Sequence, residues 1–268
     1  MSPGAATMRL ATLAIALVAT LGASPADPVS EAVRPTAKII LFNHRDLNGW
    51  SAFLHDHHAE DPLHVFSVRD GLLRISGEEW GGIATTRAYR DYRLVVEWKW
   101  GSATWGERKD RARDSGILVH AVGPDGAAGG NWLESIESQV IEGGAGDFLP
   151  VAGLRKPSLV AEVRQEGDQI IWQRGGERRT ITEGRVNWFG RDPAWKDVLG
   201  FRGSRDVERP TGQWNRQEVI ARADSLRNIV NGVTVNEVTQ SSHTAGRIQI
   251  QSEGAEILVR TVELHPVE

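Results

Sequence analysis

Four polar side chains stand on two short apolar segments near the middle of the chain. Asp114 and His120 bound the first segment, and Glu137 and Gln139 lie within the second. Short apolar runs bounded by glycines are typical of buried β-strands. Because side chains alternate along a strand, Asp114 and His120 are expected on one face of the first, and Glu137 and Gln139 on one face of the second. Two acids, an imidazole and an amide on one sheet surface would form a site rather than a core.

The composition excludes several functional classes. The chain has 268 residues, of which 40% are hydrophobic and 25% charged, which suits one large globular domain. A formal net charge of −4 provides no basic stripe, so a nucleic-acid partner is not expected. The chain has no cysteine, so disulfides and thiolate chemistry are excluded.

The first residues have the pattern of a secretory signal peptide. Arg9 precedes an apolar run over residues 10–21, and small residues follow through Ala23 and Ala26. This run is too short to span a bilayer, and the pattern predicts a signal peptide over residues 1–26. A flexible leader is expected over residues 27–37, and the protein is expected to be exported to the periplasm or the cell exterior.

The rest of the chain predicts many short strands. Asp70-Gly71 and Asn231-Gly232 are the turn pairs of tight hairpins, and Leu94, Val96 and Trp98 alternate with polar neighbours. About a dozen strands without an amphipathic helix indicate two antiparallel sheets packed face to face. We therefore expect an all-β jelly-roll sandwich as a single domain over residues 38–268. Residues 183–215 read as a long loop of the kind that serves a site.

Several motifs, in order, resemble one known family. They are Leu41 to Trp50, Ser115-Gly116-Ile117, the Glu137, Gln139 and Ile141 pattern, Trp214-Asn215, Val230-Asn231-Gly232 and Gly246-Arg247-Ile248. This order resembles the 3-keto-disaccharide hydrolase domain family, also described as 3-keto-glucoside lyase/hydratase. The resemblance covers residue 38 to the end and implies a concanavalin A-like jelly roll. Many members have Asn and Arg where this chain has Asp114 and His120.

The resemblance implies chemistry on a sugar oxidised at C3, such as a 3-keto-glucoside or disaccharide. A C3 ketone acidifies the C2 proton, so a base removes it, the C1 substituent leaves and water adds back. Glu137 and His120 are then the candidate base and acid, and Gln139 would orient the sugar. Asp114 would orient His120, or join His120 and Glu137 in binding a divalent metal cation. No cofactor other than such a cation is expected, and the oligomeric state is not predicted.

Four further residues are candidates for substrate binding, and two other functions stay open. Trp132 and Trp195 are candidates for stacking on a sugar ring, Arg113 for neutralising an enolate, and Glu142 for contacting the sugar. Glu137 and Glu142 also have the spacing of the catalytic pair of laminarinase-type glycosidases, although plain alternation puts them on opposite faces. A non-catalytic, lectin-like sugar-binding module is the third reading.

Each candidate also has a purely structural explanation. Asp114 would fix a turn, His120 would be a hydrogen-bonded histidine at a strand end, and Glu142 would be a loop residue. Glu137 and Gln139 would lie on a solvated sheet face. The histidine-rich run over residues 55–58 reads as a polar loop rather than a metal site, because adjacent strand residues point apart.

Overall fold

The computed structural model describes Met1 and residues 31–267, and in these residues the protein is almost entirely β-structure. Apart from one 3-10 helix, η1 (Gly106–Arg108), every regular element described is a strand. The strands are β1 (Ile39–Ile40), β2 (Trp50–Leu54), β3 (Phe66–Arg69), β4 (Leu72–Ile75), β5 (Gly81–Thr85), β6 (Tyr92–Thr104), β7 (Asp114–Val122), β8 (Glu134–Ile141), β9 (Phe148–Val151), β10 (Leu159–Glu166), β11 (Gln169–Trp172), β12 (Glu177–Ile181), β13 (Asn215–Arg222), β14 (Ser225–Val230), β15 (Val233–Thr239), β16 (Arg247–Ser252) and β17 (Ala255–Pro266).

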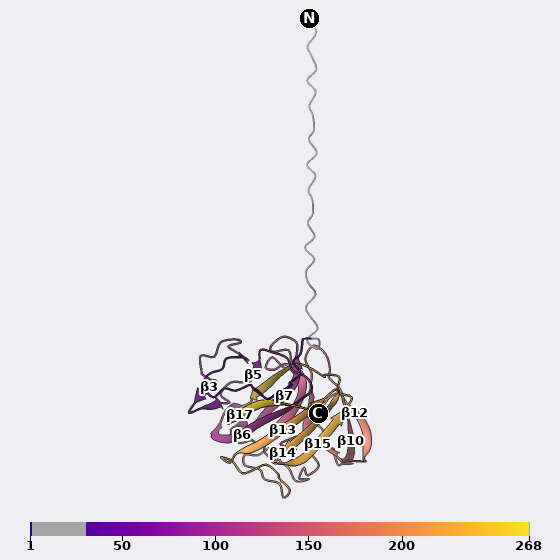
Figure 1. Cartoon of the computed structure of the whole chain (residues 1–268). Helices are drawn as coiled ribbons and strands as arrows, with labels where there is room; N and C mark the ends of the chain where they lie inside the picture. The colour runs from indigo at the N-terminus through magenta and orange to yellow at the C-terminus, as the bar shows by residue number, and fades with distance from the viewer. Residues whose placement is uncertain (2–30, 268) are drawn as a thin grey trace.

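The strands form two antiparallel sheets that pack face to face (Figure 1). The larger sheet has 11 strands, in the order β11-β10-β15-β14-β13-β6-β17-β4-β3, with β1 paired to β17 and β12 paired to β10. The smaller sheet has six strands, in the order β2-β5-β16-β7-β8-β9. The predicted jelly-roll sandwich of two antiparallel sheets is confirmed.

The core between the sheets is built largely by alternation along the strands. Leu94, Val96 and Trp98 of β6 are buried in one apolar cluster together with Ile117 of β7 and Ile136 of β8. Trp98 and Trp100 pack edge to face with their ring centroids 5.2 Å apart. Aromatic pairs of this kind add to the free energy gained by burying apolar area. The alternation that predicted strands therefore also sets which face of each strand is buried.

Two hairpins are closed by the turn pairs identified in the sequence. Asp70 and Gly71 have positive φ angles of 52° and 74° between β3 and β4, and Asn231 and Gly232 have 49° and 85° between β14 and β15. Positive φ at both central residues is the requirement of a type I′ turn, whose twist matches paired strands. Both hairpins are paired antiparallel, in the register that these turns impose.

Of the N-terminal region, the structure describes Met1 and the chain from residue 31 onward. The signal peptide over residues 1–26 lies outside the described residues, as does the first part of the leader. Val33, expected in a flexible leader, instead accepts a hydrogen bond from Arg90 N (3.0 Å) and donates one to Ala88 O (2.9 Å). Regular contacts with the sandwich therefore begin before Lys38. Within the described part of the chain, none of the helical structure is long and apolar enough to cross a membrane.

The long segment between β12 and β13, residues 182–214, contains no strand and packs across the end of β8. The indole Nε1 of Trp188 donates to Gly143 O (3.1 Å), and the indole Nε1 of Trp195 donates to Glu142 O (2.9 Å). These contacts bring a segment that is distant in sequence beside the central strands. The segment thereby supplies side chains to the site described next.

Candidate active site

The smaller sheet turns a row of polar side chains away from the core. Ile117 and Val119 of β7 and Ile136 and Val140 of β8 belong to the apolar cluster between the sheets. Alternation therefore directs Glu137 and Gln139 of β8 to the opposite face. Gly116 of β7, which is paired with Gln139, lies on that face too.

A missing side chain at Gly116 makes room for two side-chain oxygens. A Cβ atom on Gly116 would lie closer than 3.0 Å to Glu137 Oε1 and to Gln251 Oε1, a separation that real Cβ atoms do not show. Both oxygens are buried and have no hydrogen-bond partner in the structure. A buried polar atom without a partner costs free energy, and such atoms collect where a ligand or reaction needs them. The space above Gly116 is therefore the centre of the candidate site.

Three carboxyl groups share this region, and burial raises the pKa of each. Burial raises the pKa of Glu137 to about 8, and the nearby charge of Asp114 adds to the shift. Burial also raises the pKa of Asp114 to about 7, against the opposing effect of Arg108. The pKa of Glu253 is well above its usual value for the same reason, with Asp114 and Glu137 contributing. Carboxyls tuned toward neutrality can both give and take protons at physiological pH.

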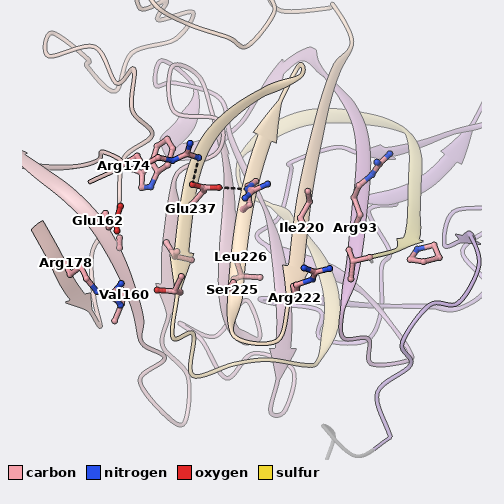
Figure 2. A pocket seen from close by; sticks show the side chains of 17 residues that line it. Arg93, Val160, Glu162, Arg174, Arg178, Ile220, Arg222, Ser225, Leu226 and Glu237 are labelled. Carbon is pink, nitrogen blue, oxygen red and sulfur yellow. Dashed lines mark hydrogen bonds and ion pairs between the residues drawn. The ribbon is translucent and has the colours of Figure 1, made fainter. Parts of the chain in front are cut away.

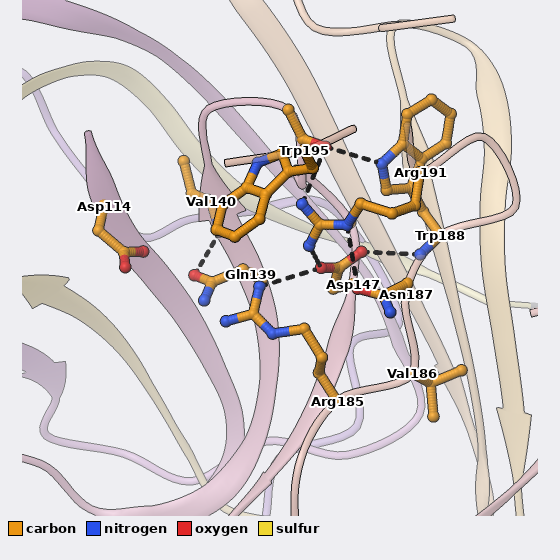
Figure 3. A network of polar contacts seen from close by, with 12 residues as sticks. Asp114, Gln139, Val140, Asp147, Arg185, Val186, Asn187, Trp188, Arg191 and Trp195 are labelled. Atoms are coloured by element: carbon orange, nitrogen blue, oxygen red, sulfur yellow. Dashed lines mark hydrogen bonds and ion pairs between the residues drawn. The ribbon is translucent and has the colours of Figure 1, made fainter. Parts of the chain in front are cut away.

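Two arginines offset part of this negative charge. Arg108, in η1, forms an ion pair with Asp114 and another with Asp197 (3.0 Å). Arg185 lowers the pKa of both Asp114 and Glu137 by its charge, although it makes its ion pair with Asp147 (3.2 Å). Figure 3 shows the Arg185 guanidinium beside Gln139 and Asp147. The Arg185 side chain is 30% exposed, so it is less buried than the Asp147 carboxylate with which it pairs.

Asp147 fixes the segment that carries Arg185. Its carboxylate is fully buried, accepts a hydrogen bond from Trp188 N (2.7 Å), and forms ion pairs with Arg185 and Arg191 (Figure 3). A buried carboxylate with several donors is strongly held, because removing any donor leaves charge unpaired. The Asp147 network therefore anchors residues 185–191 against β9.

His120 does not join this group, and the expected shared face with Asp114 is wrong. A β-bulge lies between Val119 and Val122, and His120 has a positive φ of 52°. A bulge adds a residue to one strand and so breaks the alternation. The His120 ring packs against core residue Tyr92, with centroids 5.6 Å apart, and its Nδ1 lies 2.9 Å from the backbone oxygen of His243. Burial lowers the pKa of His120 to about 4, so the ring is neutral.

The metal site expected from Asp114, His120 and Glu137 is not assembled. His120 faces the core, whereas Glu137 faces away from it. In the part of the chain that the structure describes, no group of three or more histidine, cysteine, aspartate or glutamate side chains is arranged to hold a metal ion. Asp114, His120 and Glu137 therefore do not form the expected binding site for a divalent metal cation.

Glu142 and Arg113 form a buried ion pair of their own. Arg113 Nη1 lies 2.8 Å from Glu142 Oε1, and both side chains are nearly inaccessible. Glu142 Oε2 also accepts hydrogen bonds from the backbone nitrogens of Arg113 (3.0 Å) and Gly200 (2.7 Å). These donors satisfy both oxygens of the Glu142 carboxylate. A laminarinase-like pair of Glu137 and Glu142 therefore has no support in the geometry.

The two tryptophans proposed for sugar stacking are engaged within the protein. The indole Nε1 of Trp132 donates to Gly81 O (2.9 Å), and its ring stacks on Trp80 with centroids 5.6 Å apart. The ring of Trp195 lies 4.6 Å below the guanidinium of Arg191. Both tryptophans thus stabilise loops that border the smaller sheet.

In the histidine-rich loop, His57 Nδ1 lies 2.6 Å from Glu79 Oε2, and this hydrogen bond raises the pKa of His57.

Sequence reasoning did not identify four members of the cluster. Gln249 and Gln251 alternate with the buried core residues of β16, so this pattern in the sequence predicts that both glutamines face away from the core. Arg108 and Arg185 stand in segments without periodicity, and Glu253 directly follows the last residue of β16. Their approach to Asp114 depends on the tertiary fold alone.

The family model for a 3-keto-alpha-glucoside-1,2-lyase-like domain matches residues 37–265. The chain belongs to this family. The 3-keto-alpha-glucoside-1,2-lyase-like family is a carbohydrate-related one, and its match spans both sheets and every residue of the cluster. The predicted family assignment is confirmed.

Several solved structures are also similar to this chain. A structure described as a glycosyl hydrolase from Parabacteroides distasonis is 17% identical, with a TM-score of 0.50, and the match covers 87% of this chain and 94% of that one. A Bacillus licheniformis β-glucanase is 12% identical (TM-score 0.46; coverage 87% and 99%), and a Bacillus subtilis carbohydrate-binding module is 10% identical (0.44; 80% and 94%). Among curated protein sequences, none matches significantly.

Proposed function

We propose that the protein cleaves glycosides of 3-keto-glucose by elimination followed by hydration, with Glu137 as the group that moves the proton. The observation that carries the proposal is the Glu137 carboxyl itself. It is buried, its Oε1 has no partner, and burial raises its pKa to about 8. Family membership supplies the sugar class, a 3-keto-alpha-glucoside.

Glu137 has the properties needed to act first as a base and then as an acid. In its ionised form, the carboxylate takes the C2 proton, whose acidity the C3 ketone increases. The electrons of the C2–H bond form the enolate, which collapses to expel the oxygen at C1 and leaves a C1–C2 double bond. The proton on Glu137 then passes to the leaving oxygen. A pKa near the working pH favours both transfers.

Arg185 and Gln139 are the candidates for holding the sugar during this step. The Arg185 side chain is half-buried and less covered than that of Arg108, and its guanidinium lies beside Gln139 (Figure 3). A fixed positive charge near the C3 oxygen would stabilise the enolate more than the ketone, which lowers the barrier. The amide of Gln139 would bind a sugar hydroxyl. Water then adds to C1 and a proton returns to C2, so the net reaction is hydrolysis.

The test is turnover of p-nitrophenyl 3-keto-α-glucoside by the wild type and by Glu137→Gln. We expect Glu137→Gln to lower the rate by about 10²–10⁴, the usual contribution of a general acid–base group, with an unchanged thermal midpoint. The control substrate, p-nitrophenyl α-glucoside, has no ketone and should not react. An unchanged rate in Glu137→Gln, or equal hydrolysis of the control substrate, would exclude this mechanism.

A further inference from the structure

Five arginines surround a hollow on the outer face of the larger sheet, on the other side of the sandwich from Glu137. The hollow has a volume of about 590 Å³ and lies over β10, β13, β14 and β15 (Figure 2). Its charged residues are Arg93, Arg174, Arg178, Arg222, Arg227, Glu162 and Glu237. A third carboxylate, that of Glu218, forms an ion pair with Arg93 (3.1 Å). Five arginines against these three glutamates give a local charge of +2, whereas the whole chain has a net charge of −4. The hollow is therefore more positive than the chain as a whole.

The three glutamates leave part of this positive charge unpaired. Glu237 forms ion pairs with both Arg174 (2.9 Å) and Arg227. Figure 2 shows the ion pair between Glu237 and Arg174. Glu162 accepts a hydrogen bond from the backbone nitrogen of Gly175 (2.7 Å) instead. Across residues 31–267, no carboxylate lies within ion-pair distance of Arg178 or Arg222. Among the described residues these two guanidiniums therefore lack the carboxylate partner that an anionic ligand would supply.

The floor of the hollow is aliphatic. Val160 and Ile220 line it between the charged side chains. Ile220 pairs in register with Arg93 on one side and with Arg227 on the other, so an apolar position lies between two guanidiniums. Strands are about 4.8 Å apart, which puts those two arginines on strands about 10 Å apart. An apolar floor between guanidiniums suits a sugar ring that carries a carboxylate, because the ring can contact the floor while a guanidinium binds the carboxylate.

The strands beneath the hollow cannot accept a peptide as an additional strand. β13 is paired with β6 and β14, and β14 is paired with β15, so their backbone groups are already bonded. Recognition here must use side chains alone, whereas acidic peptides that bind sheets usually gain main-chain hydrogen bonds at an edge. The acidic balance of the whole chain also disfavours nucleic acid.

We propose that this hollow is a second carbohydrate site, which binds an oligosaccharide containing uronic acids. Arg178 and Arg222 would hold the carboxylates, and the aliphatic floor would contact the rings. The proposal does not rest on the catalytic role of Glu137, because the two sites lie on different sheets. Such a site would hold the protein on an acidic polysaccharide while the other face acts on its substrate.

The experiment is calorimetric titration of the full chain with a galacturonate hexamer at low salt. We expect Arg178→Ala/Arg222→Ala to weaken binding at least tenfold. The matched control, Arg179→Ala/Arg216→Ala, removes the same charge from neighbouring positions that are paired with Glu177 and Glu218, and should bind within threefold of wild type. The thermal midpoint of each variant checks folding, and the two single substitutions replace the double variant if it unfolds.

Three results would overturn the proposal. One is the absence of measurable hexamer binding by the wild-type chain. Another is equal loss in the test and control variants, which would show only a response to net charge. The third is equally tight binding of a glutamate hexamer, which would indicate an acidic peptide ligand. Glu137→Gln should bind the hexamer as wild type does, so failure here and failure of the catalytic proposal are separable.

Discussion

At the scale of single residues, the proposed chemistry depends on one buried carboxyl group, that of Glu137, whose Oε1 has no hydrogen-bond partner among the described residues. Burial and the charge of Asp114 raise the pKa of Glu137 to about 8. A pKa shift of this size makes the group a stronger base when ionised and keeps a proton available when it is not. Gly116 is equally necessary, because any side chain there would occupy the space beside Glu137 Oε1.

Substituting Gly116 tests this use of space. A Cβ in Gly116→Ala would displace the ends of the Glu137 and Gln251 side chains, which are flexible, rather than backbone atoms. We expect turnover of the 3-keto-glucoside to fall at least tenfold while the far-ultraviolet circular dichroism spectrum stays unchanged. Wild-type turnover in Gly116→Ala would show that the placement of the Glu137 and Gln251 side-chain ends over this glycine is not needed for the reaction.

Replacing Asp114 should move the pH profile in a defined direction. The negative charge of Asp114 raises the pKa of Glu137, so Asp114→Asn lowers that pKa below about 8. Because the ionised form of Glu137 is the base, the rising limb of kcat/KM against pH should shift to lower pH. The profile of kcat/KM from pH 5 to 9 measures the shift. A limb that stays in place, or moves to higher pH, contradicts this electrostatic coupling.

At the scale of elements, β7 and β8 show what alternation predicts and where it fails. The outward orientation of Glu137 and Gln139 follows from the buried Ile136 and Val140 around them, and this is visible in the sequence. The inward turn of His120 follows from a bulge, which depends on how the partner strand is aligned and has no simple sequence pattern. One extra residue is enough to reverse a side chain.

The bulge gives His120 a structural role that can be measured. His120→Gln removes the ring that packs on Tyr92 but leaves the outward face of β7 intact. We expect the free energy of unfolding to fall by about 1–3 kcal/mol, from lost packing and a disturbed buried hydrogen bond. Turnover at a temperature where the variant is folded should stay within threefold of wild type. A loss of 100-fold or more in a folded variant would return His120 to the reaction.

At the scale of the whole molecule, the sandwich separates two faces with different charge. The smaller sheet carries Asp114, Glu137 and Glu253 in a buried cluster, and the larger sheet carries an arginine-lined hollow. The jelly roll itself is predictable, because turn pairs and alternation occur along most of the chain. The approach of Arg185 to Glu137 is not, because it depends on a long segment without periodicity that Asp147 anchors.

The central claim is that cleavage proceeds through loss of the C2 proton, and deuterium incorporation tests it most directly. The wild-type protein would be given p-nitrophenyl 3-keto-α-glucoside in deuterium oxide, and the 3-keto-glucose formed in the first turnovers analysed by mass spectrometry and NMR. Free 3-keto-glucose incubated alone corrects for spontaneous exchange. Elimination followed by hydration predicts one deuterium at C2 in each product molecule. Product formed at the full rate without deuterium at C2 would contradict the mechanism.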